Sequence, residues 1–304
     1  MNLKKISIIF SPILLLSNEQ SNIFDYYHES LCAVLVNSSN SIDDYFIEGN
    51  RTVSSKTYAK FSTSFAEESG SGMESDVRFR LRLNLPKIQK SLRLYFEDES
   101  SDDILYDGTT LNEQKLDKKR YFLRLDFFNY VKDTFDVRVG GGVRFRKDAL
   151  SPYLNLRSNY KLYSSERYTT KLYDRFRKYI DGEVENSFEF NSIYTLNSNT
   201  YITFRNRLHY KSENAFTSLS NSLSIVDIFN DKQQLSYGFS LFSDVGDFHN
   251  LNVEYYDLYS SFHHLFYKDW VYYEISPSIL KRERNGFDIS YRLLVNFGID
   301  FKTQ

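Results

Sequence analysis

Hydrophobic and polar residues alternate along most of the chain from residue 51 onward. In segment 76–85, apolar residues occupy the odd positions and Asp, Arg or Asn the even ones, and segment 134–146 repeats this arrangement around three glycines. A period of two places successive side chains on opposite faces of a strand, whereas in a helix it would mix both faces. The pattern predicts fourteen strands, near 51–66, 74–85, 91–98, 119–130, 134–146, 151–163, 167–178, 183–196, 199–211, 215–226, 232–243, 249–259, 264–279 and 286–301. Twelve strands is the alternative, because three of these segments (167–178, 215–226 and 249–259) alternate less regularly.

The alternation fits either a soluble β-sandwich or a membrane barrel, since both have one apolar and one polar face. The predicted strands are long compared with the ~5–6 residues common in soluble sheets. The chain also holds few turn residues, with 12 Gly and 4 Pro. Aromatic residues such as Phe61, Tyr121, Phe135 and Phe145 stand near strand ends on the apolar face, as in the aromatic girdles of outer-membrane proteins. We therefore predict an all-β fold, a transmembrane antiparallel up-and-down β-barrel in the bacterial outer membrane.

The N-terminal segment has a different pattern. Lys4 and Lys5 precede an apolar stretch, Ile6 to Leu16, that is too short to span a bilayer, which is the arrangement of an export signal. A short buried helix of a soluble domain is the alternative. Helical spacing then predicts one helix over 22–36 and a second over 41–47 with Ser41 as its N-cap. The predicted organisation is a signal peptide (1–17), an N-terminal periplasmic helical segment (18–50) and a barrel (51–304).

The last predicted strand carries an apolar file that continues almost to the C-terminus. Its members are Tyr291, Leu293, Val295, Phe297, Ile299 and Phe301. An alternating terminal strand that ends in Phe resembles the insertion signal of bacterial outer-membrane barrels, although three residues follow the Phe here. Two further stretches, 83–94 (Leu-Asn-Leu-Pro, then Leu-Arg-Leu) and 270–277 (Trp-Val-Tyr-Tyr-Glu-Ile-Ser-Pro), resemble an uncharacterised family of proteobacterial outer-membrane proteins. The resemblance implies the barrel fold and the outer-membrane location, and it implies no activity. The partners expected for such a barrel are outer-membrane lipid and, during insertion, the barrel-assembly machinery.

The composition of the chain excludes several classes of protein. The 304 residues are 17% aromatic, yet the mean hydropathy is −0.49 and the net charge is −2. The aromatic content excludes a disordered chain, and the balanced charge argues against nucleic-acid binding. The single cysteine, Cys32, excludes a disulfide scaffold. We interpret Cys32 as a small hydrophobic residue within the first helix rather than a catalytic thiol.

The polar files carry an uneven distribution of charge. If the apolar files face lipid, the polar files line the lumen, and its first half is basic. The predicted pore-lining residues are Arg78, Arg80, Arg82, Arg93, Arg124, Arg138, Arg144, Arg157, Lys171, Arg175, Arg205 and Arg207. Two interpretations stand side by side: a passive pore that favours small anionic solutes, and a non-conducting structural or assembly protein in which the arginines pair with Glu and Asp.

The connections between predicted strands suggest an orientation. With the N-terminus in the periplasm, the longest connection, about 99–118, lies outside, and short turns such as 131–133 lie in the periplasm. The outside connection begins with several acidic residues, but it lacks the spacing of a calcium loop. We therefore expect no metal site there.

An outer-membrane lipid hydrolase is the remaining alternative. Among five histidines, His209 shares the lumen file with the predicted pore arginines and is followed by Ser212 and Glu213. The pair His263–His264 falls at a predicted turn. None of these spacings matches a hydrolase motif. The glycine run 140–142 lies within a strand and is no phosphate loop, so it indicates a bend or a close approach in a curved barrel. We expect no enzyme, no cofactor and no metal.

Overall fold

The computed structural model describes residues 18–46, 57–85, 92–98, 121–145, 149–212, 216–245 and 251–302. The predicted signal peptide and the whole of the predicted outside connection, about 99–118, lie outside these described residues. The elements are α2 (Asn18–Phe46), β1 (Tyr58–Glu68), β2 (Gly72–Asn84), β3 (Arg93–Asp98), β4 (Tyr121–Lys132), β5 (Phe135–Phe145), β6 (Leu150–Ser164), β7 (Tyr168–Tyr179), β8 (Val184–Thr195), β9 (Thr200–Lys211), β10 (Phe216–Asn230), β11 (Gln233–Val245), β12 (Leu251–Tyr267), β13 (Val271–Arg282), the 3₁₀ turn η6 (Glu283–Asn285) and β14 (Ile289–Lys302).

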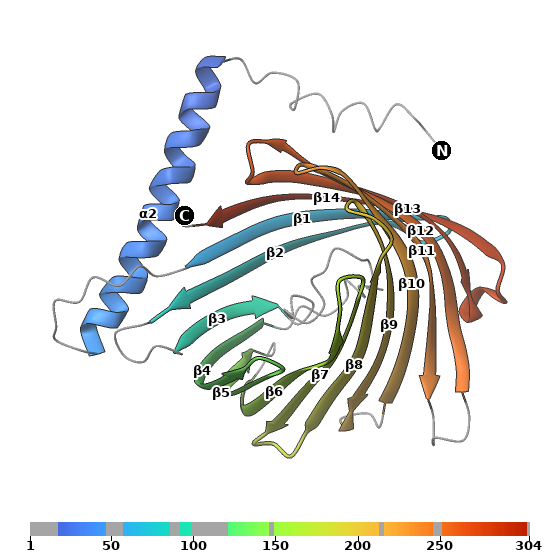
Figure 1. The fold of residues 1–304 in the computed structure, drawn as a ribbon, viewed down its shortest axis with the longest axis horizontal. Coiled ribbons are helices and arrows are strands. Elements are labelled where there is room, and N and C mark those ends of the chain that lie inside the picture. Colours follow the sequence, from blue (N-terminus) through green and yellow to red (C-terminus); the bar gives the residue numbers. More distant parts are fainter. Residues whose placement is uncertain are drawn as a thin grey trace.

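The strands form one closed antiparallel barrel, in which every strand pairs with its neighbours in sequence (Figure 1). The barrel closes between its first and last strands, from the pair Tyr58–Lys302 to the pair Glu68–Arg292. The prediction of fourteen strands is confirmed, and the twelve-strand alternative is excluded. Closure gives every described strand a paired neighbour on both sides, although the short β3 pairs with only part of β2 and β4. Such pairing satisfies the backbone of a sheet within lipid.

Burial alternates along the strands, as the hydrophobic pattern requires. In β6, Tyr153, Asn155 and Arg157 are buried, whereas the intervening Leu154 and Leu156 are 64% and 41% exposed. The polar face therefore points into the barrel, and the apolar face points outward. Such an outer surface is unfavourable in water and favourable against acyl chains.

Two predicted strand boundaries were wrong. The twelfth strand does not end near residue 259; β12 continues to Tyr267, and the turn to β13 lies at 268–270. His263 and His264 consequently lie inside β12 rather than at a turn, with His264 Nδ1 3.1 Å from the hydroxyl of Tyr273. The strand was hard to recognise because aromatic and histidine residues occupy both of its faces there, so the alternation is lost.

The two predicted helices are one continuous helix, α2, and Ser41 lies inside it rather than at an N-cap. No Gly or Pro interrupts residues 18–46, so nothing in the backbone ends the helix between the two predicted pieces. α2 crosses the ends of β14, β1 and β2 at the rim where the barrel strands begin and end (Figure 1). Among the described residues, no helix is long and apolar enough to cross a membrane.

The rim beside α2 also carries the short turns 133–134, 231–232 and 268–270. The longest interval between strands, from Asp98 to Tyr121, belongs to the opposite end. Outer-membrane barrels keep short turns on the periplasmic side and long connections outside. The α2 rim is therefore assigned to the periplasmic side.

Glycine permits close packing on the inner face, as predicted for the run 140–142. A Cβ added to Gly142 would stand 2.7 Å from the ring of Tyr153 and in contact with the carbonyl oxygen of Leu123. A Cβ on Gly298 would likewise overlap the ring of Tyr272. These two tyrosines lie flat against the wall only because the facing residue has no side chain.

Candidate functional site

The twelve predicted basic residues all lie on strands β2 to β9. Six are buried (Arg80, Arg124, Arg144, Arg157, Arg175 and Arg205) and six are half-buried (Arg78, Arg82, Arg93, Arg138, Lys171 and Arg207). We call this surface the basic wall: the inner faces of β2 to β9. Whether it lines a conducting pore remains a prediction.

Carboxylates lie among the arginines of the basic wall. Arg124 Nε is 3.0 Å from Asp126, and Arg138 is 2.7 Å from Asp136. These partners are two residues apart on one strand, and a strand places such residues on the same face. The pairs could have been recognised in the sequence, where Asp and Arg recur at this spacing. Neighbouring strands supply others, such as Arg205 with Glu189 at 3.2 Å.

A denser charge cluster lies near the outer end of the basic wall. Arg144 forms an ion pair with Glu183, and it lies 3.3 Å from Glu185. Glu185 also accepts a 3.0 Å hydrogen bond from the hydroxyl of Tyr179 and lies 3.5 Å from Arg177. The guanidinium of Arg144 lies 3.7 Å from the centre of the Tyr179 ring, a cation–π contact. The two arginines and two glutamates of this cluster thus compensate one another's charge.

Aromatic rings support this cluster from the inner face. Phe122, Tyr153 and Tyr179 are buried against one another, and the guanidinium of Arg177 lies 4.4 Å from the Phe122 ring. The sequence pattern did not predict them, because large aromatic residues were assigned to the lipid-facing files. Their position on the polar file was the signal that could have found them.

The inner faces of β10 to β13 and the start of β14 have different chemistry. We call this surface the serine wall, after its buried inward-facing residues Ser220, Ser222, Ser224, Ser236, Ser240, Ser261, Ser276 and Ser290. Some hydroxyls bond to one another or to an acid: Ser276 to Ser261 at 2.7 Å, and Ser261 to Glu274 at 2.8 Å. Serine at every second position from 218 to 224 is visible in the sequence. We did not predict a role for these residues.

His209, the predicted candidate for an enzymatic role, lies on β9 within the basic wall. Its Nδ1 is 2.6 Å from Ser187 Oγ, and Arg175 donates a 3.0 Å hydrogen bond to the same hydroxyl. A hydrolase triad instead needs a carboxylate that orients the imidazole. Of the two residues expected beside His209, Ser212 accepts a hydrogen bond from the backbone of Val184 at 2.7 Å. The other, Glu213, lies outside the described residues.

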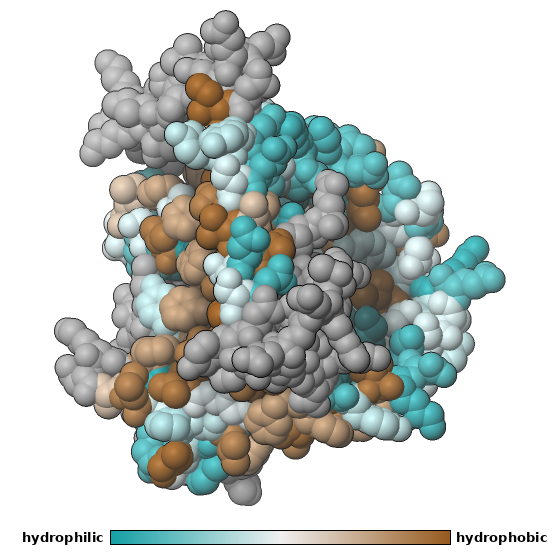
Figure 2. Space-filling view, turned by 90° about the vertical axis from the view of Figure 1, so that its left-hand side faces the viewer, coloured by the Kyte–Doolittle hydropathy of each residue, from teal (hydrophilic) through white to brown (hydrophobic). Residues whose placement is uncertain are grey.

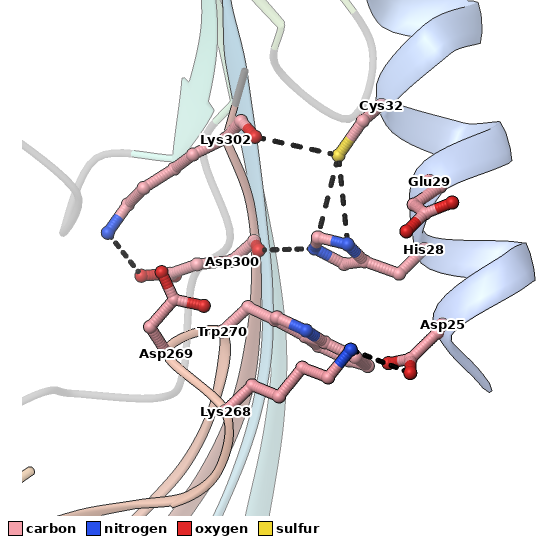
Figure 3. A pocket seen from close by; sticks show the side chains of 9 residues that line it. All are labelled: Asp25, His28, Glu29, Cys32, Lys268, Asp269, Trp270, Asp300 and Lys302. Carbon is pink, nitrogen blue, oxygen red and sulfur yellow. Dashed lines mark hydrogen bonds and ion pairs between the residues drawn. The ribbon is translucent and has the colours of Figure 1, made fainter. Parts of the chain in front are cut away.

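A cavity of about 370 Å³ lies between α2, the β12–β13 turn and the end of β14 (Figure 3). The ring of His28 stacks on Trp270 with centroids 4.1 Å apart, and His28 Nε2 is 3.0 Å from the carbonyl oxygen of Asp300. Asp25 pairs with Lys268 at 2.6 Å. The Lys268 ammonium lowers the pKa of Asp25, and this carboxylate in turn raises the pKa of Lys268.

Cys32 also faces this cavity, with its sulfur 3.7 Å from the carbonyl oxygen of Lys302 (Figure 3). Partial burial raises the pKa of its thiol, with a smaller contribution from Glu29. A protonated thiol is a poor nucleophile and a poor metal ligand. Among the described residues, no group of three or more His, Cys, Asp or Glu side chains is placed to hold a metal ion.

The predicted insertion file (Tyr291 to Phe301) lies on the outward face of β14. Tyr291 is 64% exposed, as expected for a side chain that faces lipid. Ile299 lies toward the periplasmic end, where it pairs with Phe61 of β1 and Val271 of β13. The role of this file in insertion remains a prediction.

A closed fourteen-strand barrel with an exposed apolar outer face and a charged interior is an outer-membrane β-barrel of the Gram-negative type. No family model and no curated protein matches the chain. Solved structures resemble it in fold. OmpT of Vibrio cholerae, expressed in the outer membrane, is 11% identical with a TM-score of 0.50, and the match covers 82% of this chain and 99% of that one. The outer-membrane channel DcaP of Acinetobacter baumannii is 9% identical with a TM-score of 0.50, covering 82% and 96%. At these identities the likeness concerns the fold alone.

Proposed function

We propose that the barrel is a passive diffusion channel that favours small anionic solutes. The observation that carries this proposal is the excess of cationic side chains on the basic wall. The arginines and lysine of that wall outnumber its described carboxylates, among which are Glu74, Asp76, Glu97, Asp126, Asp136, Glu183, Glu185 and Glu189. A lumen lined by excess positive charge lowers the energy of an anion and raises that of a cation.

The serine wall supports the proposal through its short, uncharged side chains, which lie beside the buried Tyr255, Tyr259 and Tyr272. In a ring of fourteen strands, strands seven places apart face each other, so β4 and β5 face β11 and β12. Serine side chains extend only a short way from the sheet, whereas arginine extends far into the lumen. A fourteen-strand barrel is also wider than the eight-strand barrels that side chains fill. This geometry suits a channel in which anions pass between arginines and hydroxyls.

The experiment is single-channel recording of the refolded chain in a planar bilayer under a KCl gradient. We expect discrete conductance steps and a reversal potential on the side of chloride selectivity. The double variant Arg205→Gln/Arg207→Gln should move the reversal potential toward zero. Lys178→Gln is the matched control, because Lys178 is an exposed residue bonded to the carbonyl oxygen of Gly182. An equal shift in the control would contradict the proposed role of the lumen charge.

A non-conducting structural barrel is the second candidate, and one observation favours it. Arg124, Arg144, Arg177 and Arg205 are almost completely buried, as expected if their main role is to hold the interior together. Under this alternative the refolded protein is electrically silent, although it is fully inserted and heat-modifiable on gels. That outcome would contradict the channel proposal and favour a structural role for the barrel in the membrane.

A further inference from the structure

The first half of α2 exposes a continuous apolar surface. We call it the α2 stripe: Ile23, Phe24, Tyr27, Leu31 and Val34, all between 48% and 62% exposed. Spacings of three and four residues place these side chains on one side of the helix. Figure 2, which views the side of the molecule that carries α2, shows exposed apolar atoms among polar ones. Apolar side chains stabilise a helix only when they are removed from water, so an exposed stripe of this kind indicates contact with another apolar surface.

Tyr27 and Val34 of the α2 stripe point away from the barrel, and Phe24 and Leu31 lie on the flank of the helix between them and the barrel. The helix holds the rim through polar side chains: Asp25 to Lys268, His28 to the backbone of β14, and Ser39 to the carbonyl oxygen of Asn84. At 100° per residue these positions lie on the side of the helix opposite Tyr27 and Val34. The barrel therefore does not bury the stripe, and another medium must meet it.

The position of α2 identifies that medium. His28 stacks on Phe301, which belongs to the lipid-facing file of β14, with ring centroids 5.2 Å apart. Where α2 packs against β1 and β2, the outward residues Ala59 and Leu83 are buried rather than exposed. α2 therefore lies against the outer surface of the rim, and its stripe continues the apolar belt of the barrel at the level of the membrane interface.

The charge of α2 narrows the class of lipid. The helix has no Lys or Arg, and it carries acidic residues, among them Asp25 and Glu29. It has no means of attracting anionic headgroups, which basic interfacial helices use. Tyr27 has the ring and hydroxyl that suit the boundary between acyl chains and headgroups. We propose that the α2 stripe docks into the periplasmic leaflet on zwitterionic phospholipid and anchors the N-terminal segment there.

The test uses the full chain with Cys32→Ser, refolded into phosphatidylcholine vesicles, with a bimane fluorophore on an introduced cysteine. Leu31→Cys places the probe on the stripe. Ala33→Cys is the matched control, because Ala33 is exposed but lies on the flank of the same helix turn. Brominated acyl chains should quench the Leu31 probe several-fold more than the Ala33 probe, and aqueous iodide should show the reverse preference.

Equal quenching of both probes by iodide would overturn the proposal, because it would place the stripe in water or against a periplasmic protein. Gel heat-modifiability of each labelled variant shows that the barrel has folded, so a misfolded variant is not mistaken for an undocked helix. A further comparison adds phosphatidylglycerol to the vesicles. Bromolipid quenching of the Leu31 probe that increased with anionic lipid would contradict the assignment to zwitterionic lipid. The test does not depend on conductance, so it stands or falls separately from the channel proposal.

Discussion

The basic wall and the serine wall share one sheet but are stabilised in different ways. On the basic wall, each buried guanidinium is expensive to remove from water and needs carboxylates or ring faces as partners. On the serine wall, a buried hydroxyl carries no charge, and hydrogen bonds such as those of Ser261 and Ser276 are of ordinary strength. The two walls thus differ in the charge of the polar groups that they bury and in the partners that these groups need.

This difference predicts which wall tolerates substitutions without a large loss of stability. Losing one member of a buried ion pair leaves its partner charged and unsolvated, whereas losing a serine hydroxyl removes one weak interaction. We expect the basic wall to be sensitive in stability and the serine wall to be tolerant. The following substitutions test that expectation, beginning with the largest effect.

The first substitution is Glu185→Ala in the basic wall. Glu185 lies against Arg144, Arg177 and the hydroxyl of Tyr179. Its loss leaves two buried cations with less compensation and should lower the free energy of unfolding by about 3–5 kcal/mol. The measurement is guanidinium unfolding in detergent micelles, followed by tryptophan fluorescence.

The matched change in the other wall is Ser240→Ala. Ser240 is fully buried on β11, and alanine fits its space. The loss should be at most about 1 kcal/mol. If the two variants were equally destabilised, the contrast between the walls would be wrong.

Two glycine substitutions give a second comparison, because the same methyl group is added to one residue of each wall. Gly142→Ala brings a methyl group to 2.7 Å from the Tyr153 ring, and Gly238→Ala brings one to 2.7 Å from Ser224 Cβ. Such overpacking should cost each variant about 1–3 kcal/mol. Gly141→Ala is the control, because its nearest neighbour would be the carbonyl oxygen of Tyr153 at 3.5 Å. An equal loss in the control would show that backbone freedom, not inner-face packing, sets the cost.

The smallest effect is expected at the rim, where an exposed pair shows what charge pairing contributes in water. The pKa of Asp25 is lowered by Lys268, so the pair contributes at neutral pH. Its contribution should be lost as the pH falls below about 4, through the lowered pKa of the carboxylate. The protection factors of the α2 amides, which are exchange rates corrected for the intrinsic rate at each pH, should fall slightly over this range in the native chain.

Asp25→Asn removes the titrating carboxylate while keeping its shape. Its protection factors at neutral pH should already equal those of the native chain in acid and should not change further as the pH falls. A pH response that persisted unchanged in Asp25→Asn would assign the effect to another group.

The sequence predicted the barrel, the number of strands and the basic wall, because alternation is a direct consequence of having one face in lipid and one in the lumen. It failed where that contrast weakens. His263 and His264 lie in a part of β12 with aromatic residues on both faces, so the strand seemed to end early. Phe122 and Tyr179 are apolar or aromatic but face inward, where they support arginines.

The hydrophobic pattern could not predict the serine wall or the position of α2, for two different reasons. Small polar residues on weakly alternating strands such as β10 resemble loop composition. The partners of α2 are backbone carbonyl groups of Asp300, Lys302 and Asn84, and a backbone acceptor leaves no trace in residue identity. Its exposed stripe was visible in the sequence as helical spacing, but the spacing did not reveal which side the barrel would occupy.

The contacts of α2 have a consequence for how assembly can be observed. The helix holds the end of β2 near the start of the barrel and the ends of β12 and β14 near its finish, so it can bind all three only after the first and last strands have met. The single tryptophan of the chain, Trp270, lies directly under His28 at this place. A change in Trp270 fluorescence should therefore report the final step of folding, in which β1 pairs with β14 and the barrel closes.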